Sequence, residues 1–112
     1  RGIMQRVAQW AADVPEETLN LLELSQVAGV SLRQLQSAFK AFTGMAPSQW
    51  LRLRRLNSAH RELLSRGPTE TTVAEVAMHW SFWHLGRFSS SYRALFKELP
   101  SQTLKRSAVA RR

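Results

Sequence analysis

The chain has 112 residues, of which 16 are Lys or Arg and 8 are Asp or Glu, so its formal net charge is +8. This length allows one ordinary domain or two very small ones, and the positive charge favours a polyanionic partner, nucleic acid before an anionic membrane. The lack of cysteine excludes disulfides and thiolate metal sites and suits a reducing cytoplasm. No apolar run reaches the roughly 18 residues that span a bilayer, and nothing resembles a signal peptide.

The amino-terminal part of the chain reads as two helices. Apolar residues at helical spacing predict an amphipathic helix over residues 3–12, which ends before Pro15. Thr18 and Asn20 offer caps for a second helix, whose apolar face is expected at Leu21, Leu24, Val27 and Ala28. Gly29 ends that helix in a sharp turn, because glycine enters the left-handed conformation without steric cost.

Ser31 and Gln34 have the S-x-x-Q spacing of a capping box, which predicts a third helix over residues 31–43. Its buried face is expected at Leu35, Ala38, Phe39 and Phe42. The side chains left on the outside are Leu32, Arg33, Gln36, Ser37 and Lys40. This face as a whole carries hydrogen-bond donors, acceptors and positive charge. Gly44 ends this helix, and Pro47 is well placed to start the next one.

A long helix is predicted over residues 47–64, with an apolar stripe formed by Trp50, Leu53, Leu56, Ala59 and Leu63. At about 1.5 Å per residue it would extend roughly 25 Å. Arginines line its other faces, where the simplest interpretation is a solvated surface. Residues 65–71 include Gly67 and Pro68 and are expected to form a connection.

Thr72 and Glu75 form a second capping box, opening a short helix with Val73, Val76 and Ala77 inside. The turn after it is expected at Trp80, Ser81 and Phe82. A further helix over residues 84–95 should bury Phe88, Tyr92, Leu95 and part of Leu85. Pro100 opens a last short helix, and Arg106, Arg111 and Arg112 are assigned to a frayed basic tail. No segment alternates as a strand does, so the predicted fold is all-α with about seven helices.

The second half of the chain repeats the first. A shift of 53 residues carries Phe39 onto Tyr92 and Pro47 onto Pro100. Upstream the shift is 52, as if one residue had been added to the second turn. The repeat predicts a first module over residues 1–46, a linker helix over 47–66 and a second module over 67–112, together forming one compact unit.

The sequence gives little support for an enzyme active site or a metal site. His60, His79 and His84 share no metal-ligand spacing, and no His and carboxylate pair accompanies the serines at 89–91. We therefore expect no catalytic residue, metal or cofactor. Three of the tryptophans, Trp10, Trp50 and Trp80, are expected in the core. Trp83 is left open between packing and a contact with a nucleic-acid backbone.

Two short helices joined by a tight turn, the second with a polar and basic outer face, are typical of a helix-turn-helix, whose second helix fits the DNA major groove. Two copies occur here. Over residues 21–104 the chain resembles the DNA-binding domain of AraC/XylS-type bacterial transcription regulators, with the motifs VAGVSLRQLQSAFKAFTGMAPSQWLRLRRL, AHRELL and VAEVAMHWSFWHLGRFSSSYRALFKELPSQTL. The H-L-G-R-F-x-x-x-Y-R-x-x-F stretch looks closest to the XylS-like branch.

The resemblance implies that residues 31–43 and 84–95 are recognition helices, which enter adjacent major grooves on one side of the duplex. Base contacts then fall on Arg33, Gln36, Ser37, Leu85, Gly86, Ser89 and Ser90, and DNA-backbone contacts on Ser31, Lys40, His84, Arg87 and Arg93. Arg33 is suited to guanine and Gln36 to adenine. The second set is short or apolar, which indicates that the first half of the site specifies while the second mostly holds.

The resemblance also implies sequence-specific binding to double-stranded DNA, transcriptional activation and contact with RNA polymerase. An amino-terminal effector or dimerisation domain is expected outside this chain, which starts at Arg1 rather than at a methionine. The alternative function is a basic amphipathic surface that binds a membrane or a partner protein. Ser81 and Lys97 stand where the family usually has glycine, so the Ser81 backbone is either strained or not left-handed. Ser25 replaces a small alanine, a mild change if its hydroxyl bonds the preceding turn.

Overall fold

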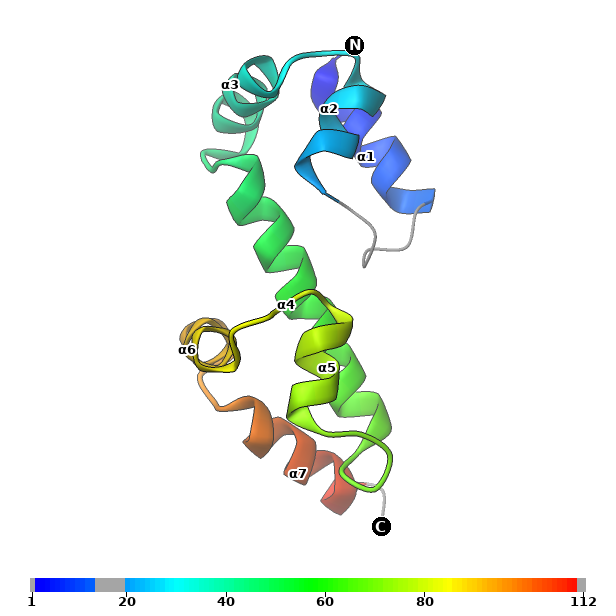
Figure 1. Ribbon diagram of the computed structural model, residues 1–112, viewed down its shortest axis with the longest axis vertical. Helices are drawn as coiled ribbons and strands as arrows, with labels where there is room; N and C mark the ends of the chain where they lie inside the picture. The colour runs from blue at the N-terminus through cyan, green and yellow to red at the C-terminus, as the bar shows by residue number, and fades with distance from the viewer. Residues whose placement is uncertain (1, 14–19, 111–112) are drawn as a thin grey trace. The chain divides into compact units, whose positions relative to one another are not determined.

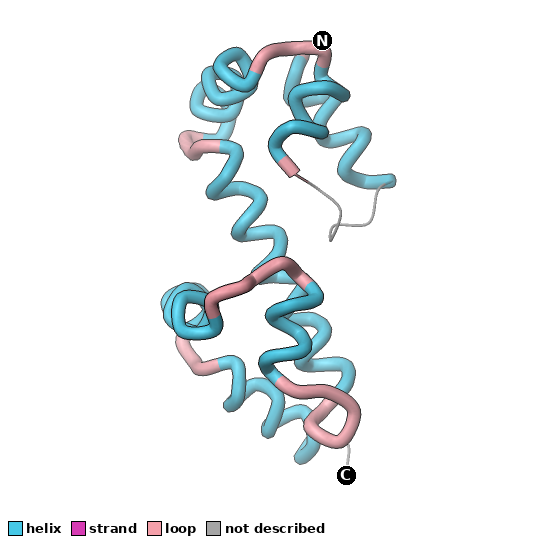
Figure 2. Tube along the Cα trace, in the orientation of Figure 1, coloured by secondary structure: helices cyan, strands magenta, loops and turns pink. Residues whose placement is uncertain are grey.

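The computed structural model describes residues 2–13 and 20–110, and all regular structure in these ranges is helical (Figures 1 and 2). The seven helices found there are α1 (Ile3–Asp13), α2 (Leu21–Ala28), α3 (Leu32–Thr43), α4 (Pro47–Arg66), α5 (Val73–His79), α6 (Leu85–Phe96) and α7 (Pro100–Ala110). The all-α prediction is confirmed. Asn20 caps α2 through its side chain, whereas Thr18 lies outside the described residues.

The chain folds as two compact units, which divide between Arg54 and Arg55 inside α4. In the first unit, α1, α2 and α3 each contact the other two. In the second unit, α5, α6 and α7 do the same. The long helix α4 contributes to both units, and each unit has a hydrophobic core of its own.

The core of the first unit is centred on α3. Leu35 and Phe39 on this helix are fully buried, together with Val7 from α1 and Leu24 from α2. The ring of Trp50 meets Phe39 edge to face at 5.2 Å, and the Arg54 guanidinium lies over Trp50 at 4.9 Å. Because close-packed interiors leave little freedom, these contacts fix the rotation of α3 about its axis.

The core of the second unit is centred on α6. Phe88 and Tyr92 are buried against Leu56, Ala59 and Leu63 of α4, Val76 and Ala77 of α5 and Leu104 of α7. The α6 rings pack in sequence, with Phe88 and Tyr92 centroids 5.7 Å apart and Tyr92 and Phe96 centroids 4.6 Å apart. The orientation of α6 is therefore fixed by aromatic packing.

Several predicted burials are wrong. Phe42 is 75% exposed, and Leu95 and Val27 are also exposed. Periodicity places Phe42 and Leu95 on the core side of their helices, but both lie in the last turn, which extends beyond the buried residues of the helix.

Arg106 is not part of a frayed tail, because it lies in α7 and pairs with Glu98. Arg111 and Arg112 lie outside the described residues. Trp10, Trp50 and Trp80 are half-buried against the two cores, whereas Trp83 is 70% exposed.

Candidate nucleic-acid interface

The turn between α2 and α3 is closed by its backbone. Gly29 is left-handed with φ of 71°, its N–H donates to the Gln26 carbonyl at 3.1 Å, and the Val30 N–H donates to the Ser25 carbonyl at 3.1 Å. The Ser25 hydroxyl donates to the Leu22 carbonyl at 2.8 Å, so the condition under which serine is a mild replacement for alanine is met. This arrangement satisfies the last carbonyls of α2 and sends the chain sharply into α3.

Helix α3 opens with the predicted capping box. Ser31 Oγ accepts from the Gln34 N–H at 3.1 Å, and the Ser31 N–H donates to Gln34 Oε1 at 3.0 Å. Since Leu35 and Phe39 occupy the buried side, the opposite side is exposed and holds the residues assigned to DNA, namely Arg33, Gln36, Ser37 and Lys40. Helix α3 contains no Asp or Glu.

Two open depressions lie beside the outer face of α3. One of about 510 Å³ is lined by Ile3, Arg33, Gln34, Ser37 and Ala38, and the other of about 460 Å³ by Gln36, Ser37, Lys40 and Ala41. Ser37 lines both, so it lies between them. The structure therefore brings Arg33 and Ser37 to one hollow, and Gln36, Ser37 and Lys40 to the next.

The turn between α5 and α6 repeats the first turn bond for bond. The Ser81 N–H donates to the Met78 carbonyl at 3.1 Å, and the Phe82 N–H donates to the Ala77 carbonyl at 2.8 Å. Ser81 has φ of 67°, so of the two alternatives the strained, left-handed backbone is the one adopted. Lys97, at the end of α6, is likewise left-handed with φ of 65°, matching Gly44 at the end of α3.

The added residue of the second turn is Trp83. Val30 and Phe82 occupy equivalent positions in the two turns, and Ser31 and His84 are the N-caps of α3 and α6. No residue separates Val30 from Ser31, whereas Trp83 separates Phe82 from His84. His84 makes no side-chain cap hydrogen bond. The sequence indicated an insertion, and the structure assigns it to an exposed tryptophan.

Helix α6 presents an outer face that differs from that of α3. Gly86, Ser90, Arg87 and Arg93 are exposed, Leu85 is 45% exposed and Ser89 is half-buried. This helix also lacks Asp and Glu. All residues that the sequence assigned to DNA therefore lie on α3 or α6 or at their N-caps, and all of them except the half-buried Ser89 are exposed.

A chain of hydrogen bonds anchors α6 to its neighbours. The buried Tyr92 hydroxyl donates to Thr103 Oγ1 at 2.7 Å and lies 2.7 Å from His60 Nδ1, so the matching His60 tautomer carries its proton on Nδ1. Thr103 in turn donates to Glu98, which also pairs with Arg106. The hydrogen bond from Thr103 and the pair with Arg106 hold the pKa of Glu98 below its usual value, while burial lowers the pKa of His60.

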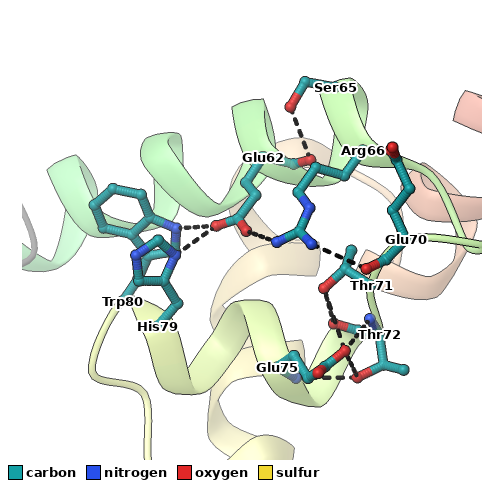
Figure 3. Close-up of polar contacts among 9 residues, drawn as sticks. All are labelled: Glu62, Ser65, Arg66, Glu70, Thr71, Thr72, Glu75, His79 and Trp80. Carbon is teal, nitrogen blue, oxygen red and sulfur yellow. Dashed lines mark hydrogen bonds and ion pairs between the residues drawn. The ribbon is translucent and has the colours of Figure 1, made fainter.

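A second cluster joins α4 to α5 around one carboxylate (Figure 3). Glu62 Oε1 accepts from Trp80 Nε1 and contacts His79 Nδ1, both at 2.8 Å, and Glu62 Oε2 accepts from Arg66 at 2.9 Å. Burial by itself raises the pKa of Glu62, but these hydrogen bonds outweigh it and the pKa lies below its usual value. The same Arg66 donates to the Glu70 carbonyl at 2.9 Å, which ties down the connection to α5.

A family model described as a helix-turn-helix domain matches residues 24–106, which include both turns and both outward-facing helices. A solved structure of a probable AraC family transcriptional regulator from Rhodopseudomonas palustris CGA009 superposes with a TM-score of 0.77 at 34% identity, covering 94% of this chain and 96% of that one. The chain belongs to the AraC-type family of DNA-binding domains. The sequence-based identification of the family is thereby confirmed.

Other relatives of this AraC-type domain are transcription regulators. The XylDLEGF operon transcriptional activator 3 of Pseudomonas putida is 34% identical over 91% of this chain, and the probable thc operon regulatory protein of Rhodococcus erythropolis is 31% identical over 93%. The chain spans 31% of the length of each. The DNA-binding domain of AdpA, solved in complex with a target DNA, has a TM-score of 0.72 at 27% identity, covering all of this chain and 97% of that one.

These similarities favour DNA binding in transcriptional regulation, a non-enzymatic role, over a surface for membranes or partner proteins. Within the described ranges, none of the helices is both long and apolar enough to cross a membrane. The anchoring roles of His60, Tyr92 and Glu62 were not predicted from the sequence of this AraC-type domain. The contact between His60 and Tyr92 joins residues 32 positions apart and that between Glu62 and His79 joins residues 17 positions apart, so no local spacing pattern reports them.

Proposed function

We propose that this domain binds double-stranded DNA sequence-specifically, with α3 and α6 in adjacent major grooves. The observation that carries the proposal is the outer face of α3, where a basic and amide-bearing row stands exposed while Leu35 and Phe39 fix the other side in the core. A helix held in this way places its side chains at defined positions against base edges. The lack of acids on α3 and α6 removes repulsion from phosphate.

In the first half of the site, Arg33 donates two hydrogen bonds to guanine and Gln36 pairs with adenine, each contact contributing about 1 to 3 kcal/mol of discrimination. Ser37 lies between the two depressions and contacts a base edge beside them. Ser31 and Lys40 contact phosphates, which positions the helix without specifying sequence.

In the second half, His84, Arg87 and Arg93 contact phosphates, while Leu85, Gly86, Ser89 and Ser90 face the bases. The small side chains let the DNA approach α6 closely. The aromatic core beneath α6 supports this interpretation, because a helix that mainly holds the duplex must resist being pulled from its unit.

The names of the relatives, among them operon activators, support a wider proposal for the parent protein. We propose that it activates transcription in the cytoplasm through contact with RNA polymerase, without a cofactor. An amino-terminal effector or dimerisation domain would supply regulation, consistent with the greater length of the relatives.

Selection of preferred sites from a random duplex library tests the DNA-binding proposal. We expect two half-sites about one helical turn, 10 to 10.5 base pairs, apart, with affinity that falls with salt and preference that survives competitor DNA. Vesicles of anionic lipid serve as the control. Equal binding to vesicles and to every duplex, without an enriched site, would contradict the proposal.

A further inference from the structure

The amino end of α6 exposes apolar side chains on both sides of its N-cap. Trp83 is 70% exposed and Leu85 is 45% exposed, and His84 stands between them. Exposed side chains of this size leave apolar surface in water at a cost of about 25 cal/mol per Å². We call Trp83 and Leu85 together the apolar pair.

The two members of the apolar pair differ in whether the first unit contains an equivalent residue. Trp83 has no counterpart in the first unit, since it is the residue added to the second turn. Leu85 does have one, because Leu32 begins α3 as Leu85 begins α6, and both are 45% exposed. The second recognition helix is thus the one whose amino end has gained an apolar side chain.

None of the other α6 residues assigned to the bases has a long polar side chain. Gly86 has open space where a Cβ would stand, with no atom within 4 Å. Ser89 is half-buried, and Ser90 carries only a hydroxyl. On α3 the positions equivalent to Gly86 and Ser89 hold Arg33 and Gln36, so the two helices differ in the kind of group they bring to a groove.

The DNA major groove has one apolar group on its base edges, the 5-methyl of thymine. We propose that Leu85 reads thymine methyl groups in the second half-site and that Trp83 excludes water beside this contact. This inference rests on the proposed function, and it gives α6 a specificity of its own beyond holding the duplex. Burying one methyl group should strengthen binding about four-fold, the factor expected for about 0.8 kcal/mol.

Deoxyuridine provides the test, because it differs from thymidine only by that methyl. The whole 112-residue chain is titrated with its selected site and with duplexes in which each thymine of the second half-site is replaced in turn. We expect the dissociation constant to rise about four-fold at one or two of these positions. The wild-type protein is used throughout this step, so the result does not depend on any variant folding.

Leu85→Ala then assigns the effect, and Leu32→Ala is the matched control with the same residue, exposure and place in its helix. In Leu85→Ala the ratio of the two dissociation constants should fall to about one, while Leu32→Ala should keep it near four. Trp83→Ala should lower the ratio without abolishing it. Comparing the ratio of the wild type with the ratio of each variant cancels any change that deoxyuridine makes to the stiffness of the duplex.

A selected second half-site without thymine would overturn the inference, as would a wild-type ratio near one. It would also fail if the ratio survived Leu85→Ala or vanished in Leu32→Ala. These outcomes leave the proposed function intact, since the chain would still bind a preferred duplex. If no duplex were enriched at all, the proposed function would fail and this inference with it.

Discussion

Gly29 and Ser81 adopt the same left-handed conformation, with φ of 71° and 67°, at equivalent places in the two helix-turn-helix turns. The N–H of each donates to a carbonyl three residues earlier at 3.1 Å. A left-handed residue with a Cβ costs about 1 to 2 kcal/mol, whereas glycine adopts this conformation freely. The second turn therefore stores strain that the first turn lacks.

Replacing Ser81 with glycine should stabilise the second unit. The strain is relieved, and the greater freedom of glycine in the unfolded chain offsets part of the gain, leaving roughly 0.5 to 1 kcal/mol. Urea denaturation followed by circular dichroism measures this difference. The reciprocal change, Gly29→Ser, should destabilise the first unit by a similar amount, because an added Cβ meets no atom within 4 Å and the backbone strain is the main effect. If both changes were neutral, the strain argument would be wrong.

Tyr92→Phe should cost about 1 to 3 kcal/mol of folding free energy, because it leaves buried partners without their hydrogen bonds. Tyr92 is fully buried and joins His60 to Thr103 at 2.7 Å on each side. Equilibrium unfolding in urea is the measurement, and Ser90→Ala on the exposed face of α6 is the control. A loss no larger than that of the control would show that the hydroxyl contributes little.

The sequence was sufficient to predict structural features that depend on residues close together in the chain. The capping boxes at Ser31 and Thr72 and the turn at Gly29 follow from side-chain types at fixed spacings, and all three form as predicted. The repeat extended the prediction, since the second turn copies the hydrogen bonds of the first although Ser81 replaces glycine.

Burial near helix ends and contacts between distant residues could not be predicted from local sequence patterns, because they depend on how far each hydrophobic core extends. Phe42 has the right spacing for burial below Leu35 and Phe39, yet it is exposed in the last turn of α3. The role of Glu62 depends on Trp80, 18 residues further along the chain, so only the packing of α5 on α4 brings them together. The DNA contacts at Arg33 and on α6 stay predictions of the family resemblance.

Glu62→Gln should destabilise the second unit near neutral pH, by about 1.5 to 3 kcal/mol if one charged hydrogen bond is lost. The pKa of Glu62 is lowered in the folded protein, so its contribution is present above the ordinary value of 4.5 and is lost as the pH falls through the folded pKa. The difference between wild type and Glu62→Gln should therefore shrink under acid. Unfolding free energies measured from pH 7 downward check this, and a constant difference would contradict it.

Arg33→Ala and Arg87→Ala should separate base reading from phosphate binding. Both arginines are exposed, Arg33 on α3 and Arg87 on α6. We expect Arg33→Ala to weaken the selected site about 5-fold to 150-fold, the equivalent of about 1 to 3 kcal/mol, while non-specific duplex loses much less. Arg87→Ala should weaken all sequences alike and lower the slope of log affinity against log salt by about one.

Electrophoretic mobility shifts at several salt concentrations, with selected and scrambled duplexes, provide both numbers. The two variants control for each other, since each removes one positive charge from an exposed helix face and differs only in the contact proposed for it. Arg33→Lys keeps the charge but not the planar fork, so it should recover non-specific affinity without recovering the preference for guanine. If Arg33→Ala lowered specific and non-specific binding equally, Arg33 would be a phosphate contact, and α3 would need another side chain to read the first half-site.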